Sequence, residues 1–127
     1  NHGGRQLDHG LGAIDVLPEV VDAVSQRSLI AVDGGFSRGT DIIKGIALGA
    51  DFVGIGRMLC YGLAAAGADG VIRMLELLEE EVKLGLGLLG ANNYSDIVPS
   101  QLCSAASTVE PSVVSAFPLL ETDKFVY

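Results

Sequence analysis

The chain has 127 residues, of which 49% are hydrophobic, and it carries a formal net charge of −8 at pH 7. The length suffices for one ordinary domain, and the negative charge argues against a nucleic-acid partner, because phosphate backbones are bound by clustered lysine and arginine. The only two cysteines, Cys60 and Cys103, form neither a disulfide framework nor a metal-ligand cluster. We therefore expect no metal and a reducing compartment, the cytoplasm.

Charged residues interrupt every apolar segment before it reaches the ~18 residues that a membrane-spanning helix needs. No basic segment precedes an apolar one at the start of the chain, as it would in a signal peptide. The sequence thus predicts no spanning helix, and it leaves open a peripheral membrane attachment through segments upstream of Asn1.

Hydrophobic periodicity divides most of the chain into alternating elements. Two short β-branched runs, typical of buried parallel strands, cover 28–35 and 51–57. Apolar residues at helical spacing predict four helices, over 13–24, 38–50, 58–67 and 69–90. In the last of these, the acidic run Glu79–Glu81 is expected to face solvent.

This alternation is typical of a parallel α/β protein. Two complete strands, with the end of a third at the start, cannot form a sheet that is covered on both faces. We therefore expect residues 1–102 to be the C-terminal part of a larger domain. Residues 103–127 are rich in Ser, Thr and Pro without clear periodicity, and they predict an extended or partly disordered tail.

Each predicted strand ends in a glycine-containing turn that opens a helix. Asp33, Gly34 and Gly35 follow the first strand, and Gly56 and Arg57 follow the second. Glycine lets the backbone approach a ligand closely, and a helix N-terminus offers unpaired amides to an anion. The pair is similar to the phosphate site that (β/α)8 barrels build after strands 7 and 8. The alternative is two ordinary tight turns, with Arg57 as a surface charge.

The opening segment pairs His2 with Arg5 across two glycines. A neutral imidazole can accept a proton near physiological pH, and a guanidinium binds a carboxylate through two hydrogen bonds. Next to a phosphate site, this pair suggests an enzyme that binds a small carboxylate substrate beside a phosphorylated cofactor. Taken alone, a His/Arg pair in a loop is usually structural or solvated.

Four motifs together resemble a known family. They are NHGGRQLD (1–8), DGG with RGTDIIKGIALGA (33–50), VGIGR (53–57) and YGLAAAGADGV (61–71). In this order and spacing they are similar to the C-terminal part of the FMN-dependent α-hydroxy acid oxidases and dehydrogenases, which include glycolate oxidase, lactate oxidase and mandelate dehydrogenase. The resemblance extends from Asn1 to about Leu102.

The resemblance implies the end of strand 6 and strands 7 and 8, with their helices, of a TIM barrel, which forms tetramers or octamers. It implies that an L-2-hydroxy acid is oxidised to a 2-keto acid, with His2 as base and Arg5 binding the substrate carboxylate. It places five residues on the loops around the FMN phosphate and ribityl chain: Asp33, Gly34, Gly35, Gly56 and Arg57. The rest of the site belongs to the N-terminal portion of the barrel, which the chain needs as a partner.

One position departs from the family pattern. Where the family commonly has an Arg, this chain has Ser37, and Arg38 follows it. One phosphate cation is therefore expected to be missing, unless Arg38 swings in or the Ser37 hydroxyl substitutes for it, and Arg57 is the more secure phosphate ligand. Two enzyme alternatives are IMP dehydrogenase-like and type 2 isopentenyl diphosphate isomerase-like barrels, which typically lack the segment that contains His2 and Arg5. A non-catalytic flavoprotein fragment is a third alternative.

Overall fold

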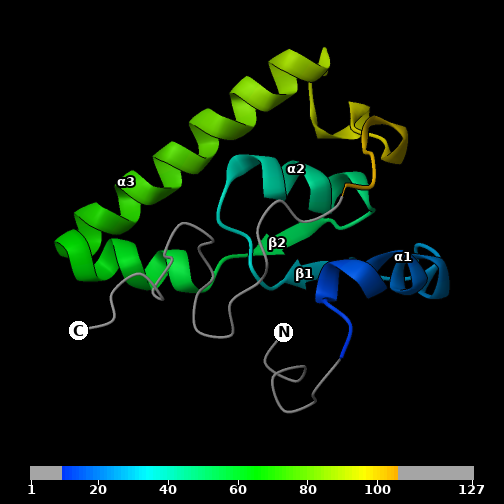
Figure 1. Ribbon diagram of the computed structural model, residues 1–127, viewed down its shortest axis with the longest axis horizontal. Helices are drawn as coiled ribbons and strands as arrows, with labels where there is room; N and C mark the ends of the chain where they lie inside the picture. Colours follow the sequence, from blue (N-terminus) through cyan, green and yellow to red (C-terminus); the bar gives the residue numbers. More distant parts are fainter. Residues whose placement is uncertain (1–9, 106–127) are drawn as a thin grey trace, which may run out of the picture.

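The computed structural model describes residues 10–105 as an alternation of helices and two short strands (Figure 1). His2 and Arg5 lie outside the described residues, as does most of the predicted tail. The elements are α1 (Ala13–Val24), β1 (Ala31–Asp33), α2 (Gly39–Ala47), β2 (Phe52–Gly54), α3 (Arg57–Leu89) and two 3-10 turns, η2 (Tyr94–Asp96) and η3 (Pro99–Gln101). Their order confirms the predicted α/β alternation. Both strands are shorter than expected, since only their central residues pair.

The two strands pair in parallel, with Val32 opposite Val53 and Asp33 opposite Gly54. The parallel arrangement brings the C-terminal ends of both strands to the same edge of the sheet. The turn that follows Asp33 and the turn that follows Gly54 therefore start side by side.

Helices cover one face of this sheet. Val32 packs in a core cluster with Leu17 of α1 and with Phe36, and Val53 packs against that cluster. On the other face Ala31 and Asp33 are exposed, and so is Phe52, at 56% of its surface. The described part of the chain thus forms a sheet with one covered and one bare face, which is half of the burial that a parallel sheet requires.

A second core cluster joins α2 to the segment after α3. Ile43 and Ala47 of α2 are buried against Ile97, and Leu86 and Leu102 pack onto the same cluster. The chain as far as Leu102 therefore takes part in the packed body.

Helix α3 consists of two segments that meet at a bend (Figure 1, green). Ala66 and Gly67 have non-helical backbone angles, and Gly67 has a φ of 59°. At the bend Gly62 and Gly70 approach so closely that a Cβ on Gly70 would lie 2.0 Å from the Gly62 carbonyl oxygen. The two segments correspond to the two helices predicted over 58–67 and 69–90.

By length and composition alone, α3 is the one helix in the described region that could cross a membrane. The bend divides it, however, and the longer segment carries charged residues from Asp69 to Lys83. Met74, Leu78 and Val82 of this segment are buried, and the segment packs against α2. This segment is therefore packed along one side against α2.

Candidate functional site

The turn between β1 and α2 begins with two consecutive glycines in left-handed conformations. Gly34 has a φ of 113° and Gly35 a φ of 85°, values that residues other than glycine rarely adopt. Phe36 follows them and is buried in the core cluster beneath the sheet. The buried Phe36 ring anchors the turn to the core, and the backbone of the two glycines lies at the edge of the sheet.

The turn after β2 lies directly beside the first. A Cβ placed on Gly54 would be 2.8 Å from the Cβ of Asp33, a distance that real side chains do not reach. Because Gly54 has no side chain, the two strand ends can pair although the Asp33 side chain lies on the face of the sheet that a Gly54 side chain would enter. The sequence reasoning did not single out Gly54, although it is the first glycine of VGIGR.

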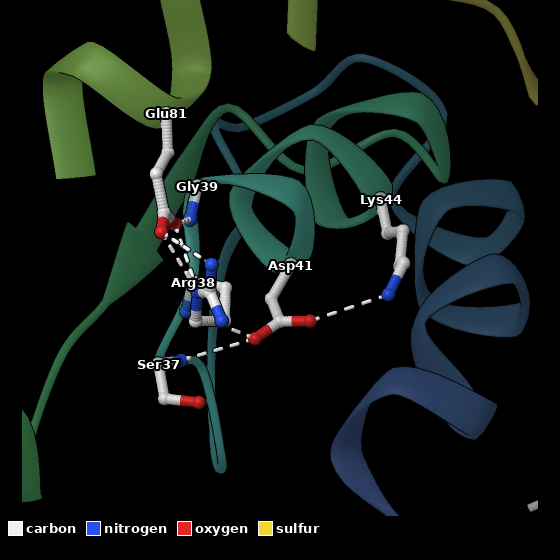
Figure 2. Close-up of polar contacts among 6 residues, drawn as sticks. All are labelled: Ser37, Arg38, Gly39, Asp41, Lys44 and Glu81. Carbon is white, nitrogen blue, oxygen red and sulfur yellow. Dashed lines mark hydrogen bonds and ion pairs between the residues drawn. The ribbon is translucent and has the colours of Figure 1, made fainter. Parts of the chain in front are cut away.

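Two carboxylates accept hydrogen bonds from backbone amides at the start of α2. The Asp41 carboxylate accepts hydrogen bonds from the backbone amides of Ser37, at 3.2 Å, and Arg38, at 3.0 Å. Its other oxygen accepts from the Lys44 ammonium at 3.3 Å (Figure 2). This is the side chain-to-amide capping that stabilises a helix N-terminus.

A second carboxylate reaches the same turn from α3. Glu81 accepts a 2.6 Å hydrogen bond from the Gly39 amide and a bifurcated hydrogen bond from the Arg38 Nε, whose distances to the two carboxylate oxygens are 2.8 and 3.1 Å (Figure 2). The side-chain hydrogen bond to Glu81 raises the pKa of Arg38 above its usual value. The same bond, with the Gly39 amide, lowers the pKa of Glu81.

These contacts correct two expectations. The amides of Ser37, Arg38 and Gly39, which lead into α2, already donate to the carboxylates of Asp41 and Glu81, so these three are not free to bind an anion. Glu81, predicted to face solvent with its acidic neighbours, instead contacts a turn 43 residues away in the sequence. No local pattern could have indicated that contact.

The N-terminus of α3 is different. No described side chain caps it, and its N-cap residue is Gly56, where an added Cβ would meet no described atom within 4 Å. The next residue, Arg57, is exposed and has no hydrogen-bond or ion-pair partner within residues 10–105. All the other described cations have partners: Arg27, Arg38, Lys44, Arg73 and Lys83.

An unpaired guanidinium beside uncapped helix amides is suited to an anion with several oxygens, because both groups donate hydrogen bonds and carry positive charge. The phosphate of a nucleotide cofactor fits this donor set. An added Cβ at Gly35 or Gly56 would meet no described atom within 4 Å, so the adjacent backbone leaves room for the group that the phosphate carries. Thus five predicted cofactor residues, Asp33, Gly34, Gly35, Gly56 and Arg57, lie on neighbouring turns at one edge of the sheet.

Comparison with known proteins places this geometry in a family. The model of the FMN-dependent dehydrogenase family matches residues 1–104. The chain is 51% identical over 102 residues to Oxidase FUB9 of Gibberella moniliformis, covering 80% of this chain and 26% of the relative. It is 46% identical over 102 residues to an L-lactate oxidase of Nostoc, covering 80% of this chain and 28% of the relative.

A solved structure gives the same result. A mandelate oxidase variant with a monooxide FMN adduct superimposes with a TM-score of 0.72 at 48% identity, over 76% of this chain and 31% of that one. The chain spans about a quarter of the length of the curated relatives it matches. The family match and these identities agree with the motifs and with the paired glycine turns. The chain belongs to the FMN-dependent dehydrogenase family, that of the FMN-dependent α-hydroxy acid oxidases.

Proposed function

We propose that this chain is the C-terminal part of a (β/α)8 barrel that oxidises an L-2-hydroxy acid to a 2-keto acid with FMN. It would contribute the end of strand 6 and strands 7 and 8 (here β1 and β2), with their helices. The observation that carries the proposal is Arg57, which stands unpaired among the described residues at the uncapped N-terminus of α3. A phosphate site at this point of a barrel matches where such folds hold phosphorylated cofactors.

In this proposal Arg57 and the first amides of α3 hold the FMN phosphate. The turn of Gly34 and Gly35 and the side chain of Asp33 would line the ribityl side, and the Ser37 hydroxyl would donate a further hydrogen bond to the phosphate. When bound, FMN accepts the electron pair that the substrate loses. The described residues position the cofactor.

The proton chemistry is assigned to the opening segment. An imidazole nitrogen of His2 would take a proton from the substrate, and the guanidinium of Arg5 would bind the substrate carboxylate through two hydrogen bonds. The assignment is supported by the resemblance of NHGGRQLD to the family motif and by the lactate and mandelate oxidases among the relatives. The substrate class is accordingly a small 2-hydroxy acid.

Two partners follow from the same proposal. The bare face of the β1–β2 sheet, with Ala31, Asp33 and Phe52 exposed, would be covered by the N-terminal portion of the barrel. The complete barrel would assemble as a tetramer or octamer, as the family resemblance implies.

Anaerobic reduction of the flavin tests the catalytic assignment. In the complete flavoprotein, a 2-hydroxy acid such as L-lactate, glycolate or L-mandelate should bleach the oxidised flavin spectrum. His2→Gln should slow bleaching by roughly 10²- to 10⁴-fold, the usual contribution of a general base. The matched control His9→Gln, in the same segment, should leave the rate unchanged.

Two results would contradict the proposal. A flavin that none of these acids bleaches would favour the non-catalytic flavoprotein alternative. A protein that binds no flavin, but turns over another phosphorylated substrate, would favour the IMP dehydrogenase-like or isomerase-like alternative.

A further inference from the structure

A carboxylate from α3 connects the two halves of the site. Glu81 binds the guanidinium of Arg38 and the amide of Gly39, a set of contacts we call the Glu81 clamp. The two helices approach closely at this point, since a Cβ on Gly39 would lie 2.5 Å from the Glu81 Cβ and 2.6 Å from the Val82 amide nitrogen. The Glu81 clamp therefore lies where α2 and α3 are so close that only glycine fits at position 39.

The clamp changes the electrostatics at the N-terminus of α2. Its carboxylate and that of Asp41 accept the hydrogen bonds of three consecutive amides, from Ser37 to Gly39. Arg38, the cation closest to the turn in sequence, is held by Glu81 through its Nε and terminal nitrogen.

The N-terminus of α3 lacks such carboxylates among the described residues. Its amides are uncapped, and Arg57 has no described partner. The turns of α2 and α3 thus carry similar sequences, each with a glycine and an arginine, but only one of them is open to an anion.

We propose that Glu81 is a positioning residue of the FMN site, which holds Arg38 and the start of α2 in the clamp and so directs the phosphate to Arg57 and α3. The inference rests on the proposed function. Arg38 is then not a phosphate ligand. Its role is to fix the turn of Gly34–Ser37, which Phe36 anchors at its centre and the clamp holds at its end.

Binding of FMN and of riboflavin, which lacks the phosphate, separates positioning from phosphate contact. The complete flavoprotein is stripped of its cofactor and titrated with each flavin, and Kd is read from flavin fluorescence. Arg38→Ala and Glu81→Gln should each raise the Kd of both flavins by the same factor, roughly three- to tenfold, as expected for the loss of a helix-capping contact. The ratio of the two Kd values should therefore stay constant.

The double variant supplies a second readout. Because Arg38 acts through its contact with Glu81, adding Arg38→Ala to Glu81→Gln should weaken flavin binding no further than Glu81→Gln alone. Glu79→Gln, which removes an exposed carboxylate from the same helix, is the matched control and should leave both Kd values unchanged.

Three results would overturn the proposal. Weaker binding of FMN alone in Arg38→Ala would make Arg38 a phosphate ligand. Tighter binding of FMN in Glu81→Gln would show that the clamp withholds Arg38 from the phosphate, and an unchanged Kd for both flavins in both variants would show that the clamp does not position the site. The phosphate site itself is checked separately by Arg57→Ala, which should weaken FMN but not riboflavin; if the Arg57 result fails, the proposed function fails, whatever the clamp variants show.

Discussion

Two glycines at the end of β2 have different tasks, although both belong to VGIGR. Gly54 sits across the register from Asp33, where a side chain would collide with the neighbouring strand. Gly56 borders open space at the start of α3. One glycine is required by the fold, and the other leaves room for a ligand.

Alanine substitutions should separate these tasks. Gly54→Ala places a Cβ 2.8 Å from that of Asp33 and should lower the free energy of unfolding by about 1–3 kcal/mol, as overpacking does. Gly56→Ala should change stability by less than about 0.5 kcal/mol but weaken FMN binding. Urea unfolding and flavin titration measure the two effects. If Gly56→Ala leaves FMN binding unchanged, the ligand does not occupy this turn.

The ionisation of Glu81 gives the clamp a pH dependence. Arg38 and the Gly39 amide lower the pKa of Glu81 in the folded state, so the folded protein favours the charged carboxylate more than the unfolded chain does. The resulting stability is fully present above the ordinary carboxyl pKa of about 4.3. It is lost as pH falls through the lowered pKa of the folded state.

Unfolding measured at several pH values tests this linkage. Glu81→Gln should be less stable than the unmodified protein at neutral pH, and the difference should shrink as the solution is acidified. A difference that stays constant down to low pH would show that the charge of Glu81 does not contribute. Glu79→Gln reports the general effect of removing a charge from the same helix.

At the scale of elements, the sequence predicted the order and kind of the α-helices and strands in the described region, but not the 3-10 turns η2 and η3. Hydrophobic periodicity located α1 and α2, and the boundary between the helices predicted over 58–67 and 69–90 falls next to the bend at Ala66 and Gly67 in α3. The same reasoning placed Asp33, Gly35 and Gly56 correctly at strand ends, because βα turns follow directly from the chain order.

What the sequence could not show was the contact between α2 and α3. Glu81 belongs to an acidic run that looks solvated, and its partners lie 43 and 42 residues away. Its distinction from Glu79 and Glu80 arises only from the angle at which α3 crosses the start of α2. The same packing determines that amides at the start of α2 donate to carboxylates while those at the start of α3 donate to no described carboxylate. The sequence alone therefore predicted the same anion-binding role for both turns.

The close approach of the two helices makes a prediction of its own. Gly39→Ala would force α2 away from the α3 backbone at Val82, and we expect a loss of about 1–3 kcal/mol in unfolding free energy. Gly87, also helical, has no described atom within 4 Å of an added Cβ. Gly87→Ala should therefore stabilise α3 by roughly 0.5–1 kcal/mol. Equal effects of the two substitutions on the denaturation midpoint would contradict the close contact.

At the scale of the molecule, the burial is one-sided. No described side chain has an exposed fraction below 2%. Large apolar residues such as Phe52, Leu84 and Leu88 are exposed to solvent. Parallel sheets are stable when both faces are covered. The bare sheet face and the open side of α3 are therefore the surfaces that the rest of a barrel would cover.

Phe52 provides the test of that arrangement. Because it is 56% exposed in this chain, Phe52→Ala should alter the stability of the chain alone by less than about 1 kcal/mol, as most surface substitutions do. In the complete barrel the same ring would face the packed interior, and its loss should cost about 3–5 kcal/mol. Val32→Ala, on the face already covered by helices, should destabilise both forms. Urea unfolding of the chain and of the complete protein distinguishes these cases. A small effect of Phe52→Ala in both forms would mean that the bare face stays open, and the proposed barrel wall would have to be abandoned.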